Sequence, residues 1–212
     1  CLLLTETVLW VGVPHIRGTV WSLLSDYIPI DMEIKADTLA RKREEYAGIV
    51  THYFGESSFD TTVDDLAAKI ADMSTYETQN FRQIKIDVHR TQPEVDLFSS
   101  KELQTMLIRI LFAWTMRHPA SAYVQGINDL AAPMVLVFLT AAVAKHRAAL
   151  PEGEAQQEGS SEEAKQAGPK VASHGSKYLE LRLEDVKGLA FEEFSGAEAD
   201  AFWCLTKLVD DI

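Results

Sequence analysis

The sequence predicts an all-α fold, and three observations carry that prediction. Apolar residues recur at the three- and four-residue spacing of a helix face along most of the 212-residue chain. The alternation of apolar and polar residues that is typical of strands, bounded by Asn-Gly or Asp-Gly turns, is missing from the sequence. With 47% hydrophobic and 25% charged residues, the composition is that of a folded globular domain.

The first elements follow from this spacing. An apolar run that begins at Leu2 indicates a helix at the start of the chain. A second helix is expected from Pro14, which suits a first turn, to Pro29, which stops it. Its apolar stripe consists of Ile16, Val20, Leu23, Leu24 and Tyr27. A third helix is expected over about residues 38–54, where Gly55 ends it.

The middle of the chain shows the clearest helical spacing. A short helix is predicted over residues 63–72 and a longer one over 75–86. Ser99 and Glu102 have the spacing of a capping box, which predicts a buried helix that starts there and ends at Arg117.

The most apolar stretch of the chain covers residues 130–144. Asn128 or Asp129 is expected to cap this helix, with Pro133 in its first turns. A bilayer requires roughly 20 apolar residues, so we interpret the stretch as a core helix rather than as a membrane-spanning segment, which is the alternative.

The composition changes abruptly over residues 151–176, which are acidic and rich in small polar residues. We expect an acidic insertion loop there, between a helical region over 1–150 and a further helical region over 177–212. Ser195 and Glu198 form a second capping-box pattern, which predicts the last helix. Because no closing element follows that helix, we expect the chain to be part of a larger domain.

Charge and residue usage exclude several classes of function. A net charge of −12 argues against binding to nucleic acid, which requires a basic face. Cys1 and Cys204 form no disulfide framework, so a reducing cytosolic compartment fits best. The six histidines show no metal-ligand spacing, and no glycine-rich phosphate-binding motif is found. We therefore expect no metal, no nucleotide and no cofactor of its own.

Two polar groups lie where an apolar core helix would not place them. Asp87 and Arg90 are one helical turn apart, just before a proline, and their simplest interpretation is a surface ion pair. The segment from Tyr123 to Asp129 joins two apolar helices, and its simplest interpretation is an ordinary turn at Gly126.

Together these groups match the motifs of a known family. Ile84-x-x-Asp87-x-x-Arg90-Thr91, followed by Tyr123-x-Gln125-Gly126, resembles the paired signatures of TBC-domain Rab GTPase-activating proteins. Arg17-Gly18-x-x-Trp21 resembles the first signature of that family. The run from Arg117 to Leu130 resembles in particular the branch of TBC domain family member 22. Three motifs in the right order are difficult to obtain by chance.

The resemblance implies a role for each motif residue. Arg90 would be an arginine finger and Gln125 a glutamine finger, both inserted into the active site of a Rab GTPase. Asp87 and Tyr123 would support the two fingers. The residues that shape their loops would be Thr91, Gly126, Asn128 and Asp129. Arg17 and Trp21 would form a structural brace.

The chemistry explains why an arginine is needed. An arginine supplied in trans neutralises the charge that develops on the transferred phosphoryl group and accelerates GTP hydrolysis roughly 10³- to 10⁵-fold. Its guanidinium is always charged and presents a planar fork of donors that lysine lacks. The resemblance further implies that GTP and Mg²⁺ are carried by the partner Rab, which is bound in its GTP state. It also implies a cytoplasmic protein, with peripheral recruitment to endomembranes through the Rab as an option.

Two functional hypotheses remain open from the sequence. The first is a GTPase activator, which completes the active site of a partner and is not an enzyme by itself. The second is a Rab-binding or membrane-traffic scaffold that does not accelerate hydrolysis. The presence of both Arg90 and Gln125 favours the activator, because a scaffold has no physical need for the pair.

Overall fold

A computed structural model of the chain describes residues 14–56, 60–149 and 181–210. Within these ranges the chain forms α-helices and a short 3-10 turn, without a strand, so the predicted all-α fold is confirmed. The elements are α2 (Pro14–Leu24), α3 (Met32–Phe54), α4 (Val63–Ile70), α5 (Thr75–His89), η1 (Asp96–Ser99), α6 (Lys101–Arg117), α7 (Ile127–Ala149), α8 (Leu183–Lys187) and α9 (Phe191–Asp210). The helix predicted at Leu2 and the acidic insertion predicted over 151–176 lie outside the described residues.

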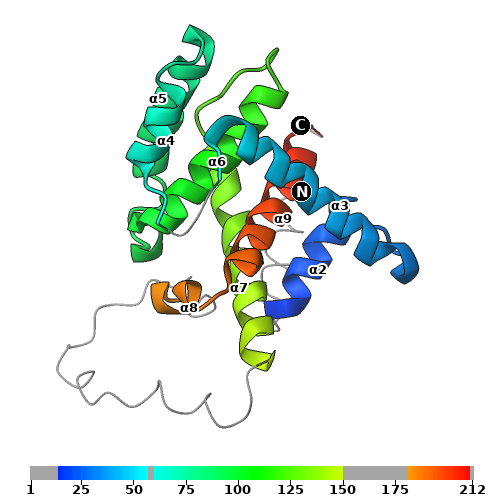
Figure 1. The fold of residues 1–212 in the computed structure, drawn as a ribbon. Coiled ribbons are helices and arrows are strands. Elements are labelled where there is room, and N and C mark those ends of the chain that lie inside the picture. The colour runs from blue at the N-terminus through cyan, green and yellow to red at the C-terminus, as the bar shows by residue number, and fades with distance from the viewer. Residues whose placement is uncertain (1–13, 57–59, 150–180, 211–212) are drawn as a thin grey trace, which may run out of the picture.

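Helix α7 runs through the middle of the arrangement (Figure 1). It packs against α9 and α2 on one side and against α6 on the other, while α4 and α5 lie side by side beyond α6. Helix α3 packs across α9. Helix α5, which contains most of the second sequence motif, and α7, which directly follows the third motif, are therefore both neighbours of α6.

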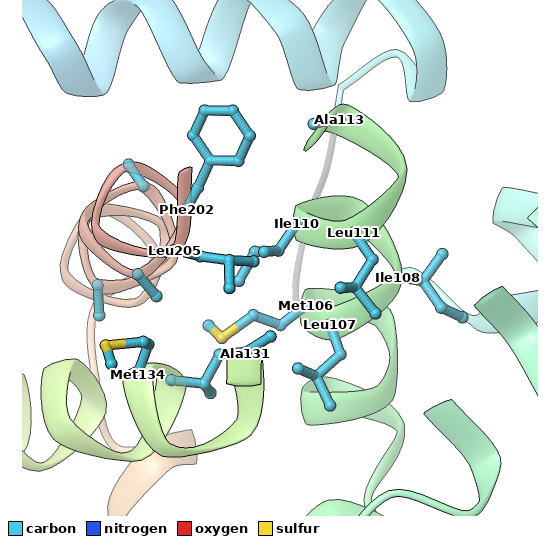
Figure 2. Packing of buried hydrophobic residues seen from close by; sticks show 14 of the residues in the cluster. Met106, Leu107, Ile108, Ile110, Leu111, Ala113, Ala131, Met134, Phe202 and Leu205 are labelled. Atoms are coloured by element: carbon cyan, nitrogen blue, oxygen red, sulfur yellow. The ribbon is translucent and has the colours of Figure 1, made fainter. Parts of the chain in front are cut away.

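The centre of the core is formed by α6, whose residues 105–115 are all buried. A helix that is buried on every face must be surrounded by other elements. Figure 2 shows how this is achieved, with Met106 and Ile110 pointing toward Leu205 of α9. Ala131 and Met134 close the same cluster from α7. The sequence prediction of a strong, buried helix up to Arg117 is confirmed.

Helix α7 is long and apolar enough to span a membrane by length and composition alone. However, 56% of its most apolar window is buried against the rest of the fold. Core helices of water-soluble domains commonly meet the same criteria, and the packing of α7 against α2, α6 and α9 is that of a core helix.

The structure corrects the predicted second helix. It ends at Leu24 instead of continuing to Pro29, and the side chains of Ile16 and Leu24 are exposed. The face that meets α7 is built on Gly18, because a Cβ placed there would lie 3.2 Å from the Cβ of Ala141. Close approach of the two helices therefore requires a small residue, and it overrides the apolar spacing.

Other helix ends differ from prediction by a few residues. Helix α3 begins at Met32 instead of near residue 38, because the carboxylate of Asp31 accepts a hydrogen bond from the N–H of Glu33 at 2.9 Å and caps the helix. Helix α4 stops two residues early, and α5 continues three residues further, to His89. Gly55 ends α3 with a φ of 71°, as predicted.

The N-caps predicted for α6, α7 and α9 are wrong. Ser100, and not Ser99, caps α6 by accepting from the N–H of Leu103. Asn128 and Asp129 lie inside the first turn of α7. Ser195 lies inside α9, which begins at Phe191, since the carboxylate of Glu193 already accepts from the N–H of Ala190 at 3.0 Å.

Candidate functional site

Asp87 lies at the C-terminal end of α5, and its side chain is completely buried. Arg90 caps the same helix and donates from Nη2 to Oδ1 of Asp87 at 2.7 Å, while its own side chain stays 52% exposed. A buried carboxylate thus orients an arginine whose guanidinium faces solvent. The i, i+3 pair expected from the sequence is present.

The backbone after Arg90 turns sharply away from α5. The hydroxyl of Thr91 donates to the backbone carbonyl of Asp87 at 2.9 Å and satisfies one of the carbonyls at the end of the helix. Gln92 then adopts a positive φ of 46°, which the helix cannot continue through, and Pro93 follows. Arg90 is consequently held at a helix end instead of along a helix face.

Tyr123 connects the segment between α6 and α7 to α5. Its hydroxyl donates to Oδ2 of Asp87 at 2.9 Å, so the two oxygens of one carboxylate hold Arg90 and Tyr123. Burial and the hydrogen bond to Asp87 raise the pKa of Tyr123 well above its ordinary range. The phenol therefore remains a proton donor at neutral pH.

Asn128 makes a second connection between the two segments. Its Nδ2 donates to the hydroxyl of Thr91 at 2.9 Å, and its Oδ1 accepts from the N–H of Gly126 at 3.1 Å. Gly126 has a φ of 106°, a conformation that favours glycine. Asp129 is exposed and accepts from Nδ2 of Asn128 at 3.2 Å. The second and third sequence motifs therefore form one hydrogen-bonded cluster.

Gln125 lies in the segment between α6 and α7, two residues after Tyr123, and its side chain is exposed. Among the described residues, none engages its amide in a hydrogen bond. The site thus presents two exposed polar side chains, those of Arg90 and Gln125, on a buried polar base formed by Asp87, Thr91 and Asn128. Such an arrangement can offer a fixed cation and a free amide to a partner.

The first sequence motif lies elsewhere. Gly18 packs on Phe138 and Ala141 of α7. At a rise of 1.5 Å per residue, this contact lies about 15 Å from the first turn of α7. Arg17 is 4% exposed, and Trp21 packs against the hydrophobic core. Both residues therefore lie on the side of α2 that faces the core, away from Arg90 and Gln125.

Sequence reasoning missed Gln83, whose Nε2 donates to Oδ1 of Asp87 at 3.3 Å. Its i, i+4 spacing on α5 was a local signal that could have revealed it. Asn80 was also missed; its Oδ1 accepts from the backbone N–H of Tyr123 at 3.1 Å. These residues are 43 positions apart, so no local pattern indicates the contact.

A second buried polar cluster, also missed, joins α6 to α9. Arg109 forms two hydrogen bonds with Glu198, at 2.8 and 2.6 Å, and the hydroxyl of Tyr46 donates to the same carboxylate at 2.7 Å. Both charged side chains are at most 3% exposed. This cluster joins α3, α6 and α9 through one buried carboxylate.

Metal ions in proteins are held by groups of ligating side chains. In the part of the chain that the structure describes, no three His, Cys, Asp or Glu side chains gather as metal ligands would.

Comparison with known proteins identifies this arrangement. The family model for the Rab-GTPase-TBC domain matches residues 14–146, a range that includes all three motifs. The chain belongs to the Rab-GTPase-TBC domain family. Residues 87–91 and 123–129 are thus parts of a TBC domain.

Individual relatives agree with this family. TBC1 domain family member 22B of Homo sapiens is 35% identical over 96% of this chain and 31% of its own length. The GTPase-activating protein GYP1 of Saccharomyces cerevisiae is 34% identical over 96% of this chain and 25% of its own length. The chain therefore spans about a third or less of the length of these relatives.

A solved structure supports the same TBC fold. The crystal structure of the Ypt/Rab-GAP domain of Gyp1p superposes with a TM-score of 0.63 at 32% identity. The match covers 96% of this chain and 50% of that chain. The helical arrangement described above is therefore that of a TBC domain, over the part of such a domain that this chain represents.

Proposed function

We propose that this TBC domain accelerates GTP hydrolysis on a Rab GTPase by supplying Arg90 and Gln125 in trans. The observation that carries the proposal is that one buried residue, Asp87, is bonded both to Arg90 and to the loop that carries Gln125. Arg90 is exposed yet oriented by buried Asp87, and Gln125 is exposed two residues after Tyr123, which binds the same carboxylate. Membership of the Rab-GTPase-TBC family supports the identity of the partner.

Arg90 acts on the phosphoryl group in this proposal. Nη2 is bound to Asp87, which leaves the other guanidinium donors available to the oxygens of a transferring phosphate. A preorganised cation that meets charge only as it develops stabilises the transition state more than the bound substrate. An arginine supplied in this way contributes about 10³- to 10⁵-fold in rate.

Gln125 orients the attacking water in this proposal. A neutral amide offers both a donor and an acceptor, so it can hold the water and contact the phosphoryl oxygen together. GTP and Mg²⁺ are brought by the Rab, which is bound in its GTP state, and the chain contributes no cofactor. The protein acts in the cytoplasm and meets endomembranes through its Rab.

Substitution of the two side chains tests the proposal in the whole protein. Activation of a panel of Rab GTPases is measured for the wild type, Arg90→Ala, Arg90→Lys and Gln125→Ala. We expect Arg90→Ala to lower activation about 10³-fold or more and Arg90→Lys to restore little of it. Arg82→Ala, an exposed arginine on the same helix, is the matched control and should leave activation unchanged.

Binding separates an activator from a scaffold. A Rab loaded with a ground-state GTP analogue should bind the wild type and both alanine variants within a modest factor. A metal-fluoride mimic of the transferring phosphate should stabilise only the wild-type complex strongly. If the double variant keeps near-wild-type activation, the two-finger mechanism is wrong. If the wild type binds Rab proteins but accelerates none of them, the mechanism is also wrong and the scaffold function is favoured.

A further inference from the structure

The loop that carries Gln125 is held at its backbone as well as at the Tyr123 phenol. Oδ1 of Asn80, on α5, accepts from the backbone N–H of Tyr123 at 3.1 Å. Nδ2 of the same amide donates to the backbone carbonyl of Tyr76 at 2.8 Å. The Tyr76 carbonyl only accepts and the Tyr123 N–H only donates, so a single orientation of the Asn80 amide satisfies both.

The contact lies next to an unfavourable backbone conformation. Ala122, which precedes Tyr123, has a φ of 56°, in the left-handed region that residues with a Cβ disfavour. Its own N–H donates to the carbonyl of His118 at 3.1 Å, so hydrogen bonds fix the backbone on both sides of it. Such a conformation persists only where its surroundings hold it.

We propose that Asn80 is a positioning residue that places Gln125 by fixing the backbone at Tyr123. This inference rests on the proposed function and adds a residue outside the three sequence motifs. Gln125 follows Tyr123 by two residues, and its own amide has no hydrogen-bond partner in the described part of the chain. Its placement therefore depends on the backbone, and an error of about 1 Å in a catalytic group can cost about 10²-fold in rate.

The effect reaches Gln125 and not Arg90. Asn80 precedes Arg90 by ten residues, which is about 15 Å along α5. Arg90 is held instead by Asp87. Removing the Asn80 amide therefore loosens one of the two catalytic side chains and leaves the other in place.

Kinetic measurements on the whole protein test this separation. Asn80→Ala should lower kcat for Rab-bound GTP hydrolysis about 10-fold or more, with little change in the KM for the Rab. Alanine favours a helix, so the substitution itself does not weaken α5. Gln79→Ala, at the neighbouring exposed amide, is the matched control and should behave as wild type. Asn80→Asp keeps an acceptor oxygen and should restore part of the loss.

Double variants distinguish positioning from a general structural role. In a Gln125→Ala background, Asn80→Ala should cost nothing further, because the group that it positions is gone. In an Arg90→Ala background it should cost its full factor. Equal losses in both backgrounds, or wild-type activity of Asn80→Ala, overturn the inference while leaving the two-finger proposal intact.

Hydrogen exchange gives a readout without any Rab. Asn80→Ala should speed amide exchange over residues 119–126 and leave the core residues 131–139 of α7 unchanged. Unchanged exchange over 119–126 contradicts the inference directly. If Asn80→Ala speeds exchange there but the wild-type protein activates no Rab, the contact is supported. The catalytic role that both proposals share is then overturned.

Discussion

The hydroxyl of Tyr123 donates to Oδ2 of Asp87 across 2.9 Å, and this bond joins two segments that lie 36 residues apart in the chain. The acceptor carboxylate is fully buried, and hydrogen bonds in such surroundings are stronger than in water. It makes the end of α5 and the loop before α7 one unit. The relative position of Arg90 and Gln125 depends on it.

Removing this hydroxyl should separate the two segments. Tyr123→Phe leaves Oδ2 of Asp87 buried without its donor, which should lower the free energy of unfolding by about 1–3 kcal/mol. Urea denaturation measures this change. Tyr53→Phe is the control, because the Tyr53 hydroxyl makes no hydrogen bond within the described residues, and its effect should be small. A Tyr123→Phe variant as stable as the control would contradict the role of the bond.

Two glycines should respond to alanine in opposite directions. Neither Gly126 nor Gly48 has an atom within 4 Å of an added Cβ, so only the backbone conformation differs. Gly126→Ala should destabilise the protein by about 1–3 kcal/mol, because φ is 106° there. Gly48→Ala, inside α3, should stabilise it by about 0.5–1 kcal/mol. Chemical denaturation of both variants checks the signs, and a shared sign would refute the argument.

The buried Arg109–Glu198 pair should be costly to break on one side only. Arg109→Met leaves a charged carboxylate buried, and about 3–5 kcal/mol of stability should be lost. Adding Glu198→Leu removes that isolated charge, so the double variant should be more stable than Arg109→Met alone. Thermal or urea unfolding of the single and double variants tests this order. Additive losses would show that the pair is not coupled.

Cys204 should be unreactive in the folded protein. Burial raises the pKa of its thiol to about 12 from an ordinary value of 9.0. A rise of three units lowers the reactive thiolate population about 1000-fold at neutral pH. In a Cys1→Ser variant, a thiol reagent should label Cys204 slowly until urea unfolds the chain. Rapid labelling of the native protein would contradict this burial.

The same shift sets a direction for stability against pH. The folded state disfavours the Cys204 thiolate, so the stabilisation is complete below pH ~9, the ordinary pKa, and is lost as the pH rises through the raised value. Tyr27 and Tyr46 have raised pKa values for the same main reason, burial of the phenol. Unfolding free energies measured at increasing pH should therefore fall on the alkaline side. A flat alkaline profile would show that these groups ionise freely in the folded state.

The sequence by itself determined the helical class and the positions of the three family motifs. Apolar spacing predicted α6 up to Arg117 and the burial of α7. Both follow from local sequence, because residues three or four positions apart form one face of a helix. The pair Asp87 and Arg90 was visible for the same reason, because residues three apart in a helix lie together. The roles proposed for Arg90 and Gln125 came from the resemblance of the three motifs to those of a known family.

Only the tertiary structure decided how those residues are held. The Asn80–Tyr123 contact joins residues 43 positions apart, and the Arg109–Glu198 pair joins residues 89 apart. Ser195 and Glu198 have the spacing of a cap, yet both lie inside α9, which begins at Phe191, and Glu198 pairs instead with Arg109 of α6. The spacing of residues in the sequence predicts contacts within one helix. Which face meets another helix, and which polar groups then share a buried hydrogen bond, is settled only when the helices pack.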